Sequence, residues 1–372
     1  MVEGMSATED AQSPADSVRI AAVGDILLAA GPVASARDPQ ALFAPVRNLL
    51  ADCDVAFGNL ECTLPGDGAT VPTEPRVVST PELIRSVQTA GFTVLSLANN
   101  HVFDHLQAGF HRVRNLLQGM GVAWFGAGDD PAQAAAPAVI DVRGLRLAFV
   151  GAVDESSGVH RFAGPDQWGV APLDMERLTT QIKQLKQQAD HVIVSPHWGE
   201  ERFGVPSPRQ IEQAHAMVDA GASMVLGHHP HVIQGLEMHC GCPIIYSLGN
   251  FVANDVPFRD GDVMRWNRTE RTSCVVVAEL TRSGVGGVRQ VATFDDGCQV
   301  RPDDSGFGDR RIAKANRALA RGVTLKRYRR EYLWVKTVKP ALTHLRWGRL
   351  KKLRWRNVRR ACHNLLKSRQ IE

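Results

Sequence analysis

A short run of residues, VLGHHPHV at positions 225–232, carries three histidines within four positions. The apolar residues 224–226 predict a buried strand, and Gly227 permits a tight turn where that strand ends. His229 and His231 are two residues apart, so in an extended segment their side chains share one side and can converge on one ion. The alternative interpretation is a polar loop whose histidines make local hydrogen bonds.

Polar side chains also follow the other short apolar runs of the chain. They are Asp25, Glu61, Asn99, Asn100, His101, Asp104, His197, Glu200, Glu201 and Asn250. Ligands of open α/β sheets bind beyond the carboxyl ends of the strands, so these groups are expected to converge on one crevice. Taken singly, each has a structural explanation, such as a turn for Asp25 or a satisfied loop histidine for His197. Together, carboxylates, an amide and imidazoles suit Zn, Mn or Fe, and the absence of thiolates argues against structural zinc.

These apolar runs alternate with segments of helical character, which predicts an α/β domain. The expected strands are residues 18–24, 54–58, 93–98, 145–152, 191–196, 223–227 and 243–248. The expected helices are residues 40–51, 81–90, 105–119, 173–189 and 207–220. Residues 273–280 and 288–294 flank a glycine-rich turn and predict an antiparallel hairpin.

Length and composition are typical of a globular protein with a substantial core. The chain has 372 residues, of which 44% are hydrophobic, and it contains no uninterrupted apolar run long enough for a transmembrane helix. Residues 1–17 are polar and acidic, which predicts a flexible leader rather than a secretory signal. The seven cysteines suggest no disulfide framework and suit a reducing cytosol, and Cys240-Gly-Cys242 does not by itself define a metal or redox site.

Charge divides the chain into two parts. Residues 310–372 contain 21 lysines and arginines and two glutamates, a net charge of +19, whereas residues 1–309 carry −15. Leu342, Leu345, Leu350 and Leu353 recur at helical spacing among basic residues and tryptophans, which predicts an amphipathic helix. Such a helix could pack on the core, settle on an anionic membrane surface, or bind an anionic polymer or nucleic acid.

Several motifs occur in an order that resembles a known family. They are GDILLA, FGNLECTL, STPELIRSVQTAGFTVLSLANNHVFDH, WFGAGDDPAQAAAPAV, SPHWGEE, GHHPHVIQGLE and YSLGNF. Over residues 18–252 they resemble the CapA family, the capsule or poly-γ-glutamate synthesis proteins, whose fold is similar to calcineurin-like metallophosphoesterases. The resemblance implies a metallophosphoesterase-like α/β/β/α sandwich, which we place at residues 18–300. The charge and leucine pattern predicts a basic helical extension at 310–372 after it.

The same resemblance implies roles for the polar residues. One or two divalent ions (Mn, Zn or Fe) would be bound by Asp25, Glu61, Asn100, His197, His229 and His231, with Glu61 as the bridging carboxylate. His101 would face the scissile group, with Asp104 orienting it, and the substrate would contact Glu201, His228 and Asn250. The chain departs from the phosphoesterase pattern at Leu27, where Asp-x-His is usual, and at Asn99, which replaces the glycine of Gly-Asn-His. Because Leu27 replaces that histidine, one ion would lose a nitrogen ligand.

These features favour a metal-dependent hydrolase of phosphoester or γ-glutamyl amide bonds in the synthesis of a capsule, poly-γ-glutamate or another extracellular polymer. A noncatalytic scaffold that holds a polymer or a synthase complex at the membrane is the alternative. The expected partners are an anionic polymer or a phosphorylated substrate, a polymer synthase complex, and an anionic membrane surface reached by residues 310–372. Nucleic acid is not expected, and the expected location is the cytoplasm or the inner face of the membrane.

Overall fold

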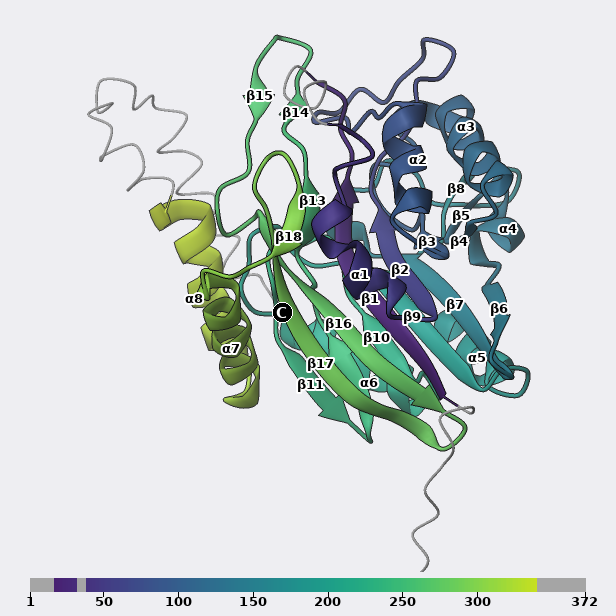
Figure 1. Ribbon diagram of the computed structural model, residues 1–372, viewed down its shortest axis with the longest axis vertical. Coiled ribbons are helices and arrows are strands. Elements are labelled where there is room, and N and C mark those ends of the chain that lie inside the picture. Colours follow the sequence, from purple (N-terminus) through teal and green to yellow (C-terminus); the bar gives the residue numbers. More distant parts are fainter. Residues whose placement is uncertain (1–16, 32–37, 340–372) are drawn as a thin grey trace, which may run out of the picture.

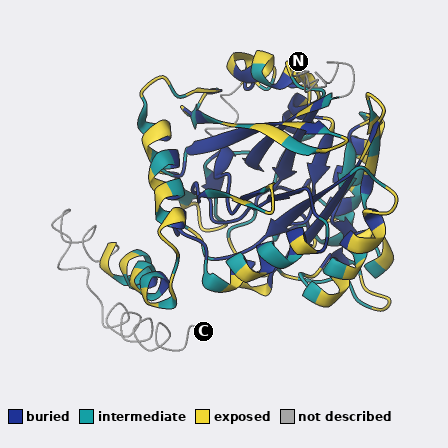
Figure 2. Ribbon diagram, turned by 90° about the horizontal axis from the view of Figure 1, so that it is seen from below, coloured by how far each residue is buried: buried dark blue, intermediate teal, exposed yellow. Residues whose placement is uncertain are grey.

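The computed structural model describes residues 17–31 and 38–339 (Figure 1). Two β-sheets pack face to face, and helices cover the outer face of each sheet. This is the α/β/β/α sandwich that the sequence predicts. Figure 2 shows the strands in the buried interior and the helices with exposed sides facing outward. Within the described residues, no helix has the length and apolar character needed to cross a bilayer.

The first sheet is mixed and has the strand order β18-β17-β16-β1-β2-β3-β4, with β13 paired to β1. Its strands are β1 Ser17–Leu27, β2 Val55–Leu60, β3 Val94–Ser96, β4 Ala123–Phe125, β13 Asn250–Ala253, β16 Thr272–Thr281, β17 Gly284–Asp295 and β18 Val300–Pro302. Strands β1 to β4 are parallel, as are β1 and β13. Strands β16 and β17 are antiparallel, which confirms the predicted hairpin.

The second sheet has the strand order β11-β12-β10-β9-β7-β6. Its strands are β6 Ala138–Val142, β7 Leu145–Val153, β9 His191–His197, β10 Met224–Leu226, β11 Leu236–His239 and β12 Cys242–Ile245. The four central strands are parallel, and the two edge strands run antiparallel to their neighbours. Two short ribbons lie outside the sheets: β5 Ala127–Gly128 with β8 Gly169–Val170, and β14 Val256–Pro257 with β15 Val263–Met264.

The described residues form eight α-helices, five of which cover the outer faces of the two sheets. They are α1 Arg47–Ala51, α2 Pro81–Thr89, α3 Leu106–Gly119, α4 Pro131–Ala135, α5 Met175–Leu185, α6 Pro208–Asp219, α7 Phe307–Ala320 and α8 Leu325–Leu333. Helices α1, α2 and α3 pack on the first sheet, and α5 and α6 pack on the second. Helix α6 begins with a capping box between Ser207 and Gln210, and Pro208 occupies its first turn.

Successive side chains of each strand point to opposite faces of its sheet, which produces three apolar layers. In β1, Ala21 and Val23 join the layer under α1 to α3, whereas Ile20 and Ala22 face the second sheet. Phe57 of β2 stacks in this central layer against Phe149, with ring centroids 5.8 Å apart. Each large side chain buried there contributes about 1.5–3 kcal/mol of transfer free energy, so the central layer fixes how the two sheets face each other.

Most sequence predictions for these elements are confirmed, but some short elements were missed. Each predicted strand and helix is present, although the helix expected at 40–51 contains only a 3₁₀ turn at Ala44–Val46 and α1. Strands β4, β6, β11 and β13 were not predicted, because isolated segments of three to five residues carry little periodic signal. The division of the chain at 300–310 stays a prediction, and the leucines of the proposed amphipathic helix lie outside the described residues.

One polar cluster joins α3 to the segment after β5. Asp129 accepts hydrogen bonds from Gln107 (2.7 Å) and Arg114 (2.7 Å) and lies 2.5 Å from His111 Nε2. Partial burial raises the pKa of Asp129, but these hydrogen bonds outweigh burial and hold the pKa at about 2. The charged carboxylate therefore stabilises the folded protein at neutral pH.

We expect Asp129→Ala to lower the free energy of unfolding at pH 7 by about 2 kcal/mol, because three donors lose their acceptor. The carboxylate contributes above its unfolded pKa of about 3.9, and this contribution is lost as the pH falls through the folded value. Urea unfolding at pH 7 and pH 3 should therefore show a smaller difference from wild type at pH 3. Asp67→Ala, which removes an exposed ion pair with Arg112, is the control and should cost less than about 1 kcal/mol. Equal effects of the two variants at pH 7 would contradict the assignment.

Candidate metal centre

Strand ends of both sheets bring the predicted ligands together. Asp25 lies near the end of β1 and Glu61 follows β2 in the first sheet, whereas His197 ends β9 in the second. His229 and His231 lie in the loop after β10, and all five side chains are buried. The predicted convergence is therefore present, but it lies between the ends of two sheets rather than at the end of one.

Asp25 is held by four groups. Its Oδ1 accepts a hydrogen bond from Asn59 Nδ2 (2.9 Å) and lies 3.1 Å from His228 Nδ1. Its Oδ2 accepts from the backbone N–H of His229 (3.3 Å) and lies 3.4 Å from His231 Nδ1. These contacts keep the pKa of Asp25 well below its usual range, although burial alone would raise the pKa. Asp25 is therefore a charged carboxylate at neutral pH.

Glu61 lies at the middle of the centre. Its Oε1 is 3.8 Å from His197 Nε2 and 3.9 Å from His231 Nε2. Two groups of potential ligands share this residue: Glu61 with His197 and His229, and Glu61 with Asp25 and His231. Within each group the ligand atoms lie within 4.8 Å of one another. This is the arrangement expected of a carboxylate that bridges two neighbouring ions.

Amide side chains surround the two groups. Asn100 Oδ1 lies 3.0 Å from His197 Nε2, and Asn100 Nδ2 donates to the carbonyl of Ser157 (3.1 Å). Asn250 Oδ1 lies 2.8 Å from His231 Nδ1. Asn250 is the first residue of β13, where it pairs with Asp25 of β1, so it begins a strand rather than ending one as the sequence had suggested.

Burial sets the protonation of the candidate ligands. It raises the pKa of Glu61 to about 8, and the charge of Asp25 acts in the same direction. It lowers the pKa of His229 to about 4, with the charge of His231 adding to the shift, so His229 is neutral and has a free lone pair. His231 is the exception, because the charge of Glu61 and the hydrogen bond to Asp25 overcome burial and raise its pKa to about 10.

The residues fit a bound cation. Among the described residues, four buried polar atoms at this centre have no hydrogen-bond partner: Glu61 Oε1, His228 Nε2, His229 Nδ1 and Asn250 Nδ2. Unsatisfied polar atoms are costly in a protein interior, and a divalent ion would satisfy carboxylate and imidazole atoms together. The donor set of oxygen and nitrogen suits a transition metal, while the choice among Mn, Zn and Fe stays a prediction.

A histidine–aspartate pair lies beside the candidate ligands. His101 Nδ1 is 2.8 Å from Asp104 Oδ2, and that oxygen also accepts from the backbone N–H of Val77 (2.7 Å). Burial lowers the pKa of His101, but the charge and hydrogen bond of Asp104 outweigh burial, so the pKa lies above its ordinary value. The charge of His101 partly offsets the raised pKa of Glu61.

The loop after β9 carries the remaining predicted residue and contacts the C-terminal helices. Glu201 is exposed, and its charge partly offsets the lowering of the pKa of His229 by burial. Phe203 of this loop packs against Tyr328 and Tyr332 of α8, with ring centroids 5.4 and 5.9 Å apart. The described part of the basic segment is thus packed on the core, as one of the three alternatives proposed.

Two glycines allow the chain to pass close to its neighbours at the centre. A Cβ on Gly24, just before Asp25, would lie 1.8 Å from the carbonyl oxygen of Gly249. A Cβ on Gly227 would lie 2.1 Å from the carbonyl oxygen of Tyr246. Gly227 is therefore required for close approach, and the turn itself is made by His229 (φ 94°) and His231 (φ 57°) in left-handed conformations. The expectation that these histidines lie in an extended segment is wrong, although both side chains reach the centre.

The sequence assigned no role to Asn59, and for Asn99 it predicted only a place among the converging polar residues. Asn59 Nδ2 donates to Asp25 (2.9 Å) and to Glu61 (3.3 Å), so one amide holds both carboxylates. Asn99 Nδ2 donates to Asn59 Oδ1 (3.1 Å), and Asn99 Oδ1 accepts from the backbone N–H of His101 (3.1 Å). The spacing of Asn59 and Glu61, two residues apart at the end of one strand, was the available signal.

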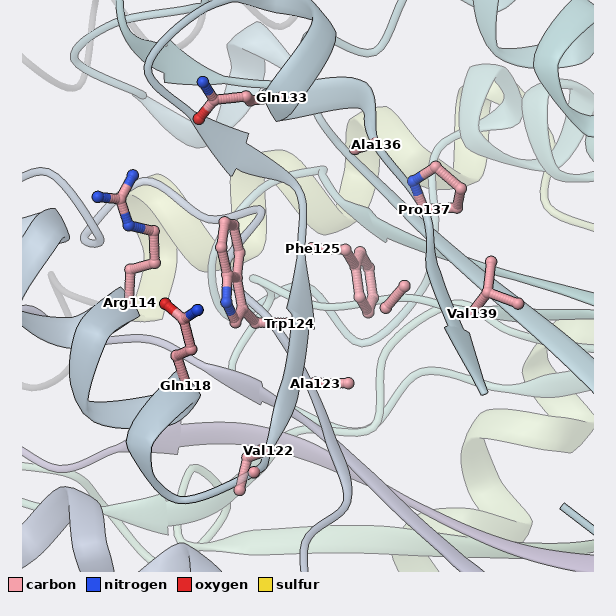
Figure 3. Close-up of a pocket in the computed structure, with 12 residues that line it drawn as sticks. Arg114, Gln118, Val122, Ala123, Trp124, Phe125, Gln133, Ala136, Pro137 and Val139 are labelled. Atoms are coloured by element: carbon pink, nitrogen blue, oxygen red, sulfur yellow. The ribbon is translucent and has the colours of Figure 1, made fainter. Parts of the chain in front are cut away.

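The hollow in Figure 3 lies apart from this centre. It has a volume of about 640 Å³ and lies between the edge strands β4 and β6, with Arg114, Trp124, Phe125 and Val139 among its walls. None of the predicted metal, catalytic or substrate-binding residues lines it. The site chemistry is therefore assigned from the buried side chains rather than from the size of a surface hollow.

The fold is that of a metallophosphoesterase-like α/β sandwich. A solved structure of similar fold is a novel phosphatase from Mycoplasma pneumoniae, with a TM-score of 0.50 and 13% sequence identity over 76% of this chain and 95% of the phosphatase. At this identity the likeness concerns the fold alone. It agrees with the two-sheet architecture.

The chain belongs to the family described as bacterial capsule synthesis protein PGA_cap, whose sequence model matches residues 19–255. It is 32% identical over 292 residues to the PGA biosynthesis protein CapA of Bacillus subtilis, covering 77% of this chain and 74% of that protein. It is 37% identical over 198 residues to the capsule biosynthesis protein CapA of Bacillus anthracis, covering 52% of this chain and 46% of that protein. The family predicted from the motifs is thereby confirmed.

Proposed function

We propose that this protein is a metal-dependent hydrolase that acts on a phosphoester or γ-glutamyl amide bond during the synthesis of a capsule, poly-γ-glutamate or a related extracellular polymer. The observation that carries the proposal is the buried centre in which Glu61 belongs to two ligand groups. The family and the names of its relatives support the polymer context. Hydrolysis is supported by the His101–Asp104 pair beside that centre.

The protein side chains have separate tasks in this proposal. Asp25, Glu61, Asn100, His197, His229 and His231 would hold the ions. Bound divalent ions would polarise the scissile group and make a coordinated water acidic. Asn59 would keep the two carboxylates in place, and His228, which contacts Asp25 at 3.1 Å and is buried against Phe57, would orient Asp25.

His101 would assist the leaving group. Its Nδ1 faces Asp104, so its protonated Nε2 is the atom that can deliver a proton when the scissile bond breaks. Glu201, His228 and Asn250 remain the proposed substrate contacts, and exposure makes Glu201 the residue among them best placed for a long polymer. The departing group takes this proton and leaves neutral. The oxygen of the attacking water forms the new bond to the phosphorus or the carbonyl carbon, and the proton that the water loses restores His101.

Purified protein loaded in turn with Mn²⁺, Zn²⁺ or Fe²⁺ would test this function with bis(p-nitrophenyl) phosphate, p-nitrophenyl phosphate and γ-glutamyl-p-nitroanilide. We expect metal-dependent turnover of one bond class, and loss of that turnover in Glu61→Gln. Binding of poly-γ-glutamate by metal-loaded protein that turns over none of these substrates, nor the polymer itself, would favour the scaffold alternative. Co-purification of a synthase complex would support that outcome further.

Residues 340–372 are proposed to bring the protein to an anionic membrane surface at the cytoplasmic face. This segment contains ten lysines and arginines and one glutamate, together with Trp347 and Trp355. We expect the full chain to co-sediment with anionic vesicles more strongly than a 1–339 truncation, and salt to weaken the difference because it screens the charges. Vesicle binding that persists at high salt would indicate that the tryptophans are buried in the lipid.

The truncation keeps α7 and α8, which pack on the core, so it tests the tail without removing packed helices. Neutral vesicles serve as the control. Equal binding of both proteins to anionic vesicles would show that the tail is not the membrane anchor. Binding of anionic polymer by the full chain in place of vesicles would assign the tail to the polymer instead.

A further inference from the structure

A second group of potential metal ligands lies at the end of the second sheet that faces away from the metal centre. It consists of Asp219 at the end of α6, and His239 and Cys240 at the turn between β11 and β12. Strand β10 runs from Met224 toward the metal centre, and β12 runs parallel to it, so the beginnings of both strands face away from Glu61. No role in the proposed hydrolase uses these residues.

The ligand atoms are already close together. His239 Nε2 lies 2.8 Å from Asp219 Oδ1, and the ligand atoms of all three residues lie within 4.8 Å of one another. The ligands of a tetrahedral zinc ion, with bonds of about 2.0–2.3 Å, are about 3.3–3.8 Å apart. Small side-chain rotations would therefore bring the oxygen, nitrogen and sulfur atoms around one ion.

Neighbouring side chains fix the ring of His239. The imidazole of His215 stacks on it, with centroids 4.0 Å apart and planes within 4° of parallel. His215 Nε2 is in turn 2.7 Å from Glu237 Oε1, which also accepts from Tyr246 Oη (2.6 Å). Support of this kind orients a metal-ligating histidine and reduces the ordering cost of binding.

The charges at this place favour a cation. Asp219 is the last residue of α6, where the unpaired carbonyl groups of a helix already carry partial negative charge. A carboxylate there is unfavourable unless a positive group approaches it. The side chain of Asp219 is 60% exposed and Cys240 is exposed, so an ion could enter from solvent.

The turn also presents the thiol in an uncommon way. Cys240 and Gly241 form a two-residue hairpin loop in which both φ angles are positive, 48° and 79°. Asparagine, aspartate or glycine usually occupies the first position of such a turn, because other side chains are strained there. The turn holds the Cys240 thiol within 4.8 Å of the ligand atoms of Asp219 and His239.

We propose that Asp219, His239 and Cys240 form a zinc-type site, separate from the hydrolytic centre, with water completing the coordination. The combination of carboxylate, imidazole and thiolate suits Zn²⁺ among the common divalent ions. Binding would release the proton of the Cys240 thiol and leave His239 neutral. The ion would connect the β11–β12 turn to α6, so its expected effect is on stability rather than on turnover.

Cobalt substitution distinguishes this site from the hydrolytic centre, because only this one contains a thiolate. We expect untagged protein with Co²⁺ to show a thiolate-to-cobalt charge-transfer band in the near ultraviolet, and Zn²⁺ to abolish the band by competition. His239→Ala should weaken Co²⁺ binding measured by this band by at least about 100-fold, and Cys240→Ser, which removes the thiolate, should abolish the band. Zn²⁺ should raise the melting temperature of wild type more than that of either variant.

Two controls make the result specific. Cys298→Ser, which removes another exposed thiol, and the double variant His229→Ala/His231→Ala should both keep the band. Because the double variant impairs the hydrolytic centre alone, failure of the hydrolase proposal would leave this result unchanged. Absence of the band in wild type at saturating Co²⁺, or full intensity in Cys240→Ser, would overturn the proposal.

Discussion

Glu61→Gln should weaken the binding of two ions, whereas His229→Ala and His231→Ala should each weaken the binding of one. The reason is that Glu61 belongs to both ligand groups, while His229 belongs to the group of His197 and His231 to the group of Asp25. The glutamine keeps the shape of the side chain but removes the charge and one acceptor. We expect a loss of affinity of at least about 100-fold for each affected ion, since even supporting residues change metal affinity by 10- to 100-fold.

Metal content should be measured by mass spectrometry after equilibrium dialysis against Mn²⁺ or Zn²⁺. A Cys240→Ser background removes any contribution from the proposed site at Asp219, so the remaining stoichiometry reports the buried centre. His160→Ala is the matched control, because His160 is exposed and is not among the candidate ligands. Stoichiometric metal in Glu61→Gln, with affinity equal to the control, would contradict the bridging role.

Folding must be checked in these variants because all the residues are buried. Glu61→Gln is the safest change, since burial already raises the pKa of Glu61 to about 8 and the neutral side chain is compatible with the metal-free protein. The histidine variants open small cavities, which cost about 20 cal/mol per Å² of cavity surface. If the free energy of unfolding measured with urea is unchanged while metal is lost, the effect is on metal ligation.

Much of the site could be predicted because parallel strands gather their carboxyl ends. Asp25, Glu61 and His197 each follow an apolar run, and the run itself identifies the strand. Local signals of this kind need no knowledge of the partner strand. They were sufficient to find residues that the fold brings within a few ångströms of one another.

Pairing between distant segments could not be predicted in this way. Asn250 lies near Asp25 because the chain leaves the second sheet after β12 and β13 pairs with β1 of the first sheet, a contact across 225 positions. The role of Asn59 depends on two carboxylates reaching the same amide, and the sequence alone does not give that geometry. The left-handed conformations at His229 and His231 likewise follow from tertiary contacts, since a histidine adopts positive φ only in a minority of cases.

Charge alone was also a weak guide to the C-terminal segment. Residues 310–339 contain eleven lysines and arginines, yet this part packs on the core through Ile312, Ala315, Tyr328 and Tyr332. Apolar residues at helical spacing between the charges explain the packing. The same reasoning applies to the sequence beyond residue 339, so the vesicle experiment is needed to separate surface binding from packing.

His101→Ala should lower kcat by about 10²- to 10⁴-fold on a substrate with a poor leaving group while leaving bound metal unchanged. The proton at Nε2 matters most when the departing group is a strong base, so the loss should be much smaller with a p-nitrophenyl leaving group. His160→Ala controls for the removal of an imidazole elsewhere. Loss of metal in His101→Ala would identify His101 as a ligand instead.

The pH profile tests the contribution of Asp104. The carboxylate overcomes burial and raises the pKa of His101, so the protonated, active form persists to higher pH than for an ordinary histidine. Activity should therefore fall as the pH rises through this raised pKa. In Asp104→Asn the hydrogen bond remains possible but the charge is gone, so the basic limb should move to lower pH while activity in acid is less affected. A purely structural role for Asp104 predicts a different result. Activity and thermal stability would then fall together at every pH, and the basic limb would stay in place.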